Sequence, residues 1–296
     1  MTVQQSLSPE LVARLRGLDL KARLVVEGFL TGLHKSPYHG FSVEFAEYRP
    51  YMPGDEPKRI DWKALARSDR YYVKEFEEET NLKAYLLLDT SASMGYRRGG
   101  APGKLEYGAC LAAALAYLLL HQHDAAGLVA FDDRIRSYLP PRSRRSHWHQ
   151  LVAALERLQA GGATRFGPVF AELAGRVRRR GLIVLISDLW DGWRDVVAAL
   201  RHFRHLKHEV LVFHVLDRDE IEFPFERDAV FRDLERGDEL PVSPAAGRAY
   251  RLRVRDWRGS LARECRRHAI DYVPLDTATP FDRALLQYLH KRQRLG

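Results

Sequence analysis

The clearest indication of the fold is the stretch Leu86-Leu87-Leu88-Asp89-Thr90-Ser91-Ala92-Ser93-Met94. Its apolar first part is typical of a buried strand in a parallel sheet. The strand ends in a carboxylate, and two serine hydroxyls follow closely. Open α/β sheets bind ligands at the carboxyl ends of their strands, and hard divalent cations prefer oxygen ligands. We therefore expect Asp89, Ser91 and Ser93 to share one tight turn that can bind a cation.

Two downstream segments can complete such a site. Gly161–Phe166 is a glycine-rich turn before an amphipathic helix, and Thr164 lies at the predicted helix N-terminus, where a hydroxyl can face a ligand. Gly181–Asp191 contains a second continuous apolar strand, which ends in Asp188. Each of these residues taken singly is more readily explained as a helix cap or a turn residue. Their order along the chain favours a metal site.

The order Asp-x-Ser-x-Ser, then Thr, then Asp resembles the metal-ion-dependent adhesion site of von Willebrand factor A (vWA) domains. The chain matches this order at Asp89, Ser91, Ser93, Thr164 and Asp188. Mg²⁺ commonly takes one or two carboxylates and keeps several waters, which suits this donor set. The resemblance implies that these five residues bind Mg²⁺, with Mn²⁺ or Ca²⁺ as alternatives.

The segment before this strand extends the resemblance. It contains Tyr48–Asp55, Arg59–Arg67 and Glu75–Glu79, and its most specific part is Ile60-Asp61-Trp62-Lys63. This pattern resembles a bacterial vWA-like family of unknown function, usually encoded beside MoxR-type AAA+ ATPases. The resemblance implies a six-stranded sheet with one short antiparallel edge strand, a divalent cation at the top of the sheet, and partnership with the ATPase. Residues 48–67 are interpreted as a structural brace, with a docking surface as the alternative.

The order of elements predicts an α/β fold, because apolar strands alternate with amphipathic helices. We expect a vWA-like, Rossmann-type sheet, mostly parallel and flanked by helices, in residues 81–296. Residues 1–80 are predicted to form an N-terminal α+β extension that begins with one helix from Pro9 to the region of Gly28–Gly32. The predicted sheet strands cover 84–89, 127–131, 135–139, 182–187, 209–215 and 271–274. The predicted helices cover 105–121, 146–158, 166–179, 193–205, 254–268 and 281–292, with a short excursion at 231–235.

Composition restricts the class of protein. The 296 residues are 46% hydrophobic and 29% charged, which is ordinary for a globular protein. Two cysteines, Cys110 and Cys265, argue against a disulfide scaffold and favour a reducing compartment. The N-terminus lacks a signal-peptide pattern, and the chain lacks an apolar run long enough to span a membrane. We therefore predict a cytoplasmic protein with no membrane span.

The predicted function is that of a non-catalytic interaction module. A carboxylate from a partner would complete the coordination of the bound cation. The partner would be a MoxR-type AAA+ ATPase, an acidic client protein, or both, and the net charge of +8 would attract acidic surfaces. One alternative is a metal-dependent phosphate-ester hydrolase, but such enzymes need a second metal or a positioned base. The other alternative, nucleic-acid binding, is less favoured because the basic residues are spread along the chain.

Two features near these motifs complete the sequence picture. Arg98–Leu105 resembles a phosphate-binding loop only in part, because Leu105 stands where Ser or Thr should hold Mg²⁺. We interpret it as a mobile basic loop beside the metal turn. Asp191 either orients the metal site through hydrogen bonds or caps the helix that follows.

Overall fold

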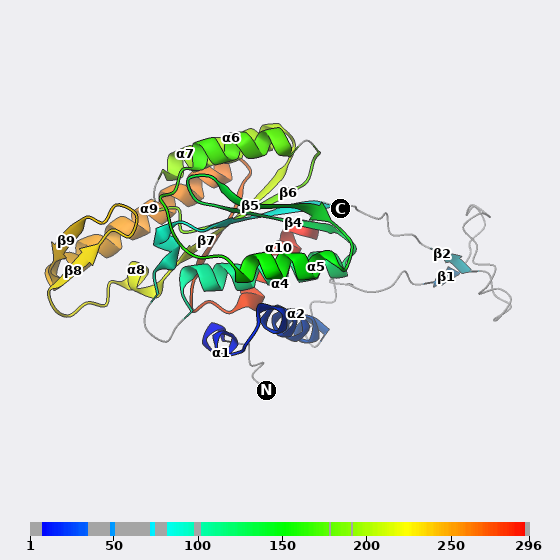
Figure 1. Cartoon of the computed structure of the whole chain (residues 1–296), viewed down its shortest axis with the longest axis horizontal. Helices are drawn as coiled ribbons and strands as arrows, with labels where there is room; N and C mark the ends of the chain where they lie inside the picture. The colour runs from blue at the N-terminus through cyan, green and yellow to red at the C-terminus, as the bar shows by residue number, and fades with distance from the viewer. Residues whose placement is uncertain are drawn as a thin grey trace.

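The computed structural model describes residues 8–34, 48–50, 72–74, 82–97, 102–177, 179–190 and 192–293. A six-stranded sheet forms the centre of the described part (Figure 1). Its strands lie in the order β10 (Asp271–Asp276), β7 (Glu209–Leu216), β6 (Leu182–Ser187), β3 (Lys83–Asp89), β4 (Ala125–Phe131) and β5 (Ile135–Arg142). β5 pairs antiparallel with β4, and the other neighbours pair in parallel. The predicted α/β class, with a mostly parallel sheet and one antiparallel edge strand, is confirmed.

The central strands β3 and β6 are continuous apolar runs. Both are buried along almost their whole length, as expected for parallel strands that are covered by helices on each face. Their register pairs Leu88 with Ile186. Asp89 is the last residue of β3, and Asp188 directly follows β6. The two carboxylates therefore meet at the carboxyl edge of the sheet, as the sequence predicted.

Helices cover both faces of the sheet (Figure 1). On one face, α4 (Lys104–His121), α5 (His147–Glu156) and α10 (Phe281–Gln293) share a core with the inward side chains of the strands. On the opposite face, α6 (Phe166–Arg176), α7 (Trp193–His205) and α9 (Gly247–Arg267) enclose a second core, rich in aromatic rings. These two cores fix the sheet, and thus the edge that carries Asp89 and Asp188.

The N-terminal segment differs from the single predicted helix. The chain turns after α1 (Pro9–Ala13), and α2 (Leu18–His34) then packs against α4. Val25, Val26 and Phe29 of α2 are buried in the same core as β3. β1 (Tyr48–Pro50) and β2 (Tyr72–Lys74) form an antiparallel pair. Most of the 48–67 block and all of Glu75–Glu79 lie outside the described residues, and the division at residue 80 stays a prediction.

The region after β7 is more elaborate than predicted. A short helix, α8 (Arg218–Glu222), follows β7 directly, and the predicted excursion is a hairpin of β8 (Ala229–Arg232) and β9 (Glu239–Val242). After the 3-10 turn η3 (Pro244–Ala246), α9 begins at Gly247, earlier than the predicted residue 254. The hairpin and the start of α9 project to one side of the sheet (Figure 1).

Two further observations bear on the predicted compartment. None of the helices in the described ranges has both the length and the apolar character needed to cross a bilayer. Cys110 and Cys265 are both buried and free. The cytoplasmic location itself stays a prediction.

Candidate functional site

The turn after β3 holds three of the five predicted residues together. Asp89 is fully buried, and its Oδ1 accepts a hydrogen bond from the backbone N–H of Ser91 at 2.9 Å. Its Oδ2 accepts one from the hydroxyl of Ser187 at 2.6 Å. The Oγ atoms of Ser91 and Ser93 lie 3.0 Å apart. Ser93 lies in the 3-10 turn η2 (Ala92–Gly95), and Ser91 is the residue directly before that turn. One carboxylate and two hydroxyls thus share one turn.

The glycine-rich loop before α6 lies against this turn. The backbone N–H of Ala92 donates to the carbonyl of Gly162, and that of Gly161 donates to the carbonyl of Thr90, each at 2.9 Å. Gly162 has a φ of 76°, and a Cβ atom there would lie 2.7 Å from Asp132 Oδ2. The loop therefore needs glycine at this position, on conformational and steric grounds.

Thr164 follows this loop, but its hydroxyl points to another partner. Its Oγ1 donates to Glu235 Oε1 at 3.0 Å, and its backbone N–H donates to Glu235 Oε2 at 3.1 Å. Glu235 lies between β8 and β9. The N-cap of α6 is Arg165, without a side-chain hydrogen bond, so Thr164 is not the cap of this helix. Thr164 instead ties the hairpin loop to the loop beside Asp89.

Asp188 is paired with a buried lysine. Lys104 Nζ lies 2.7 Å from Asp188 Oδ2 and 2.5 Å from Glu220 Oε1. The Lys104 side chain is completely buried, and Lys104 is the first residue of α4. The interpretation of this lysine as part of a mobile basic loop is therefore wrong, although residues 98–101 lie outside the described residues. The ammonium compensates the charge of the second predicted carboxylate ligand.

Burial and charge shift the protonation of these groups. Burial, followed by the charge of Asp188, raises the pKa of Asp89 to about 7, although hydrogen bonds from Ser187 and Ser91 oppose the shift. Burial lowers the pKa of Lys104, but Asp188 and Glu220 more than offset this, so its pKa is raised overall and the ammonium stays charged. A cation beside Asp89 would favour the ionised carboxylate.

A histidine behind Asp188 supports the turn. His214 Nε2 lies 2.8 Å from the backbone carbonyl of Asp188, and Nδ1 lies 2.5 Å from the hydroxyl of Tyr272. Burial lowers the pKa of His214 to about 3, so the ring is neutral. Nε2–H must then donate to the carbonyl, and Tyr272 donates to Nδ1. With both nitrogens engaged, His214 holds the backbone and has no nitrogen left to act as a base.

The donor set suits a hard cation with incomplete protein coordination. In the described ranges, no group of three or more His, Cys, Asp or Glu side chains is arranged to hold a metal. A cation at Asp89 would therefore rely on the serine hydroxyls and on water, which is usual for Mg²⁺. Lys104 would compete with the cation for Asp188. The chemistry of these oxygen donors would fit a magnesium-type ion.

Sequence reasoning missed four residues that shape the site: Ser187, Lys104, Glu220 and Glu235. Two of them have a local signal. Lys104 stands at the start of an apolar helix, where a positive charge opposes the helix dipole unless it has partners. Glu220 completes a capping box with Asp217, a pattern that also marks the start of α8. Ser187 and Glu235 act through contacts that are distant in sequence. Asp191 lies outside the described residues.

Comparison with known proteins identifies the family. Residues 47–260 match the family described as protein of unknown function DUF58. The chain belongs to the DUF58 family. Uncharacterized protein Rv1480 of Mycobacterium tuberculosis (strain ATCC 25618 / H37Rv) is 28% identical over 293 residues, covering 97% of this DUF58 chain and 91% of the relative. The predicted membership of a family of unknown function is thus confirmed.

A solved structure has a similar fold. The conserved hypothetical protein BatB from Bacteroides thetaiotaomicron has a TM-score of 0.50 and 20% identity, and the match covers 72% of this chain and 99% of BatB. The SpRpn10 VWA domain has a TM-score of 0.41 and 13% identity, with 69% of this chain and 93% of that domain covered. At 20% identity, the similarity to BatB concerns the fold alone. The association with MoxR-type ATPases stays a prediction.

Proposed function

We propose that this chain is a non-catalytic interaction module that binds a divalent cation at the carboxyl edge of its sheet and, through the cation, an acidic residue of a partner protein. The observation that carries the proposal is the gathering of Asp89, Ser91 and Ser93 on one turn beside Asp188. Oxygen donors of this kind favour Mg²⁺, with Mn²⁺ or Ca²⁺ as alternatives.

Each residue has a distinct part in the proposal. Asp89 supplies the negative charge that attracts the cation, and Ser91 and Ser93 supply neutral oxygens. Ser187 fixes the orientation of the Asp89 carboxylate through its 2.6 Å hydrogen bond. The bound cation would offer an open coordination position to a carboxylate of the partner. Asp188 could coordinate the cation only after its hydrogen bond with Lys104 breaks. Thr164 could do so only after its hydrogen bond with Glu235 breaks.

The absence of catalysis is proposed on the state of the neighbouring groups. His214 is neutral, buried and hydrogen bonded at both ring nitrogens, so it does not suit the role of general base. Lys104 keeps its proton because two carboxylates surround it. These properties favour an interaction module over a metal-dependent phosphate-ester hydrolase.

We propose a MoxR-type AAA+ ATPase as the partner, acting with this chain in protein assembly or maturation. The choice of partner rests on the family resemblance of the sequence motifs. The net charge of +8 would draw an acidic partner surface toward the chain.

Partner capture tests the proposal. The chain is immobilised as wild type and as Asp89→Asn, and the MoxR-type ATPase of the same organism is applied in Mg²⁺ or in EDTA. We expect retention only by the wild type in Mg²⁺. Asp132→Asn is the matched control, since Asp132 is another buried carboxylate near the turn and is held by Arg136. Equal retention with EDTA or with Asp89→Asn would contradict the proposal.

A further inference from the structure

A cavity opens between the carboxyl edge of the sheet and the β8–β9 hairpin. Its volume is about 870 Å³, enough for several side chains of a bound peptide. Ser93, Tyr96 and Trp190 line it on the side of the sheet, and Phe231 and Leu234 line it on the side of the hairpin. The cavity thus begins at the Asp89 turn and ends under the hairpin.

The hairpin side of this cavity is apolar and uncovered. Val230 is 63% exposed and Leu240 is 65% exposed, although both lie in paired strands. Phe231 of β8 packs against Phe225, with ring centroids 4.9 Å apart, and this contact holds the hairpin against the segment that precedes it. Exposed apolar side chains grouped beside a cavity mark an interaction site.

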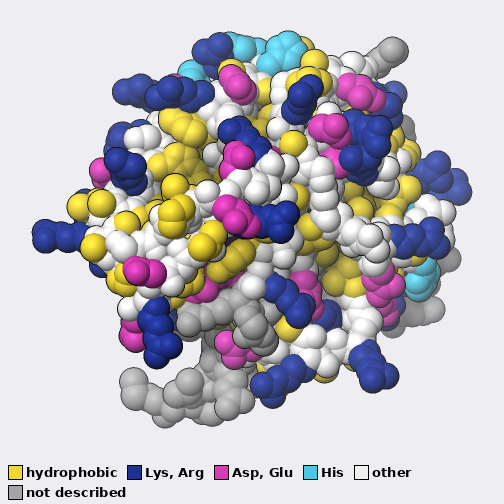
Figure 2. Space-filling view, turned by 60° about the vertical axis from the view of Figure 1, so that its left-hand side comes forward, with side chains coloured by type: hydrophobic (Ala, Val, Ile, Leu, Met, Phe, Trp, Pro, Cys, Tyr) yellow, Lys and Arg dark blue, Asp and Glu magenta, His cyan; other side chains and the backbone are white. Residues whose placement is uncertain are grey.

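Carboxylates surround this apolar surface. Among the described residues that line the cavity, the acidic ones are Asp219, Glu220, Asp233, Glu235, Asp238 and Glu239, and the basic one is Arg232. Figure 2, in which this end of the molecule comes forward, shows hydrophobic side chains exposed among both acidic and basic side chains. The chain as a whole carries a net charge of +8, so this negative rim departs from the rest of the molecule.

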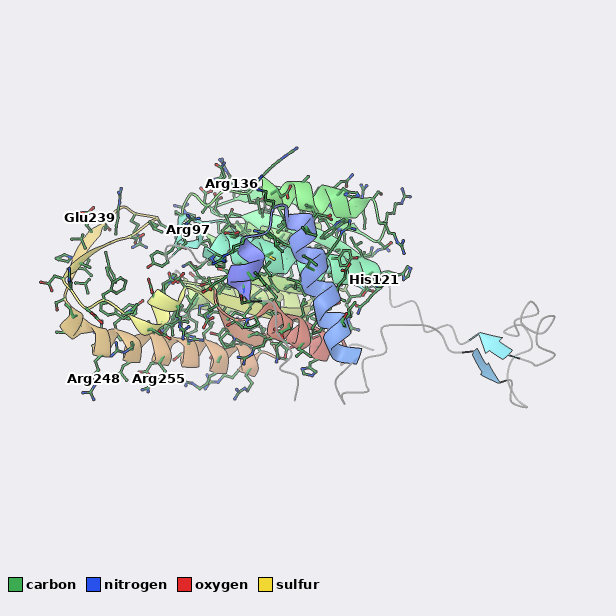
Figure 3. All side chains as sticks on the ribbon, turned by 90° about the horizontal axis from the view of Figure 1, so that it is seen from below. Arg97, His121, Arg136, Glu239, Arg248 and Arg255 are labelled. Carbon is green, nitrogen blue, oxygen red and sulfur yellow. The ribbon has the colours of Figure 1, made fainter. Side chains whose placement is uncertain are left out.

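Two arginines of the neighbouring helix α9 point away from the hairpin. Arg248 and Arg255 project from the side of α9 that faces away from the hairpin, whereas Glu239 lies on the hairpin (Figure 3). Four of the six lining carboxylates already accept hydrogen bonds. Tyr96 donates to Asp219, Lys104 to Glu220 and Thr164 to Glu235, and the backbone N–H groups of residues 235 and 236 donate to Asp233. Asp238 and Glu239 at the rim have exposed side chains and can receive a cation from outside.

We infer that this cavity and the β8–β9 hairpin dock a peptide segment of a partner in which apolar side chains alternate with Lys or Arg. The apolar side chains would enter the cavity and cover Val230 and Leu240, and the basic side chains would pair with Asp238 and Glu239. The negative rim would repel phosphate groups, which argues against nucleic acid or an anionic lipid surface. A second copy of this chain, whose net charge is positive, is a competing occupant.

The cavity lies next to the proposed cation site. The inferred peptide docking does not depend on cation binding. Ser93 belongs both to the cation turn and to the cavity wall. Glu235 joins the hairpin loop to Thr164. A partner could therefore place a basic, apolar segment in the cavity and an acidic residue on the cation. Docking of the segment itself requires no metal.

Fluorescence anisotropy with a short labelled peptide of alternating Leu and Lys tests the inference, with the full chain in EDTA. Two matched peptides replace Lys with Glu, or Leu with Ser. We expect saturable binding of the Leu–Lys peptide alone, weakened at least about tenfold by Val230→Ser with Leu240→Ser and by Asp238→Lys with Glu239→Lys. Leu252→Ser, an exposed leucine of α9 outside the cavity, should leave binding unchanged.

Several outcomes would overturn the inference. These are no binding of the Leu–Lys peptide, equal binding by the hairpin variants, or tighter binding of the Glu peptide. A concentration-dependent dimer in sedimentation that Leu240→Ser dissociates, together with no peptide binding, would assign the surface to a second copy instead. Because the peptide assay runs in EDTA and also with Asp89→Asn, its result is separable from failure of the cation proposal.

Discussion

The residue that most alters the predicted site is Lys104. A buried lysine is costly unless carboxylates surround it, and here it joins Asp188 of the candidate cation site to Glu220 of α8. The same arrangement recurs at the opposite edge of the sheet. There Lys291 Nζ lies 2.5 Å from Glu209 Oε2 and 2.8 Å from Asp271 Oδ2. The two lysines make a matched pair, one beside the proposed cation and one remote from it.

Lys104→Met should make stability depend on the cation. Removing one partner of a buried ion pair costs about 3–5 kcal/mol, because the remaining charges lose their compensation. In urea unfolding with EDTA, we expect Lys104→Met and Lys291→Met both to be destabilised. Excess Mg²⁺ should recover stability in Lys104→Met only, since it can take over the compensation of Asp188. The same response to Mg²⁺ in both variants would contradict this role.

Glu209 should contribute stability at neutral pH and lose it in acid. Burial raises its pKa, but hydrogen bonds from Arg204 and Lys291 more than offset this and lower it overall. The ionised glutamate therefore stabilises the fold above its ordinary pKa of 4.5, and the contribution disappears as pH falls through the lower folded-state value. Urea unfolding should show Glu209→Gln less stable than wild type near neutral pH, with the difference shrinking in acid. A difference that grows on acidification would refute the assignment.

At the scale of elements, apolar patterns were sufficient to place the sheet. The strands β3, β6 and β7 consist mainly of apolar residues, and their predicted positions agree with the structure within a residue. The break between α1 and α2 was missed because apolar residues continue with helical spacing across it. The hairpin was missed because β8 and β9 expose Val230 and Leu240 instead of showing a buried face.

The candidate site shows the same division between local and distant contacts. The sequence placed Asp89, Ser91 and Ser93 on one turn because strand and hydroxyls are adjacent in the chain. It placed Asp188 correctly because parallel strands end at one edge. The contacts of Lys104 with Asp188 and of Glu235 with Thr164 join residues more than 70 positions apart, so a local pattern does not indicate which residues pair.

The pairing of β4 with the edge strand β5 depends on Gly127. A Cβ atom there would lie 2.8 Å from the backbone carbonyl oxygen of Leu139 and 2.8 Å from the backbone nitrogen of Pro141, so β5 would have to shift. Gly127→Ala should therefore destabilise the protein in thermal unfolding. Gly175→Ala, in α6 with open space around it, should stabilise it by up to about 1 kcal/mol through helix propensity. Stabilisation by both variants would rule out the close approach.

For the molecule as a whole, each hydrophobic core contains one thiol. Cys110 lies in the core under α4, and Cys265 lies in the core under α9 on the other face of the sheet. Burial raises the pKa of each thiol to about 12. The two cysteines therefore report separately on the two layers of the fold.

Native protein should react very slowly with a thiol reagent such as dithionitrobenzoate. The thiolate is the reactive form, and burial both suppresses it and blocks access. Denaturant should release the reactivity of both cysteines. Each single variant, Cys110→Ser or Cys265→Ser, leaves one reactive thiol. Comparing the reaction rates of the two variants at low denaturant shows whether the two layers open together. Rapid reaction of either cysteine in native buffer would contradict the two closed cores.

Isothermal titration of Mg²⁺ into the full chain measures directly whether the turn after β3 binds a cation. We expect one site of modest affinity in the wild type, lost in Asp89→Asn and retained in Asp132→Asn. Lys104→Met should bind more tightly because the competing ammonium is gone. Absence of binding to the wild type, or unchanged binding by Asp89→Asn, would contradict cation binding at this turn.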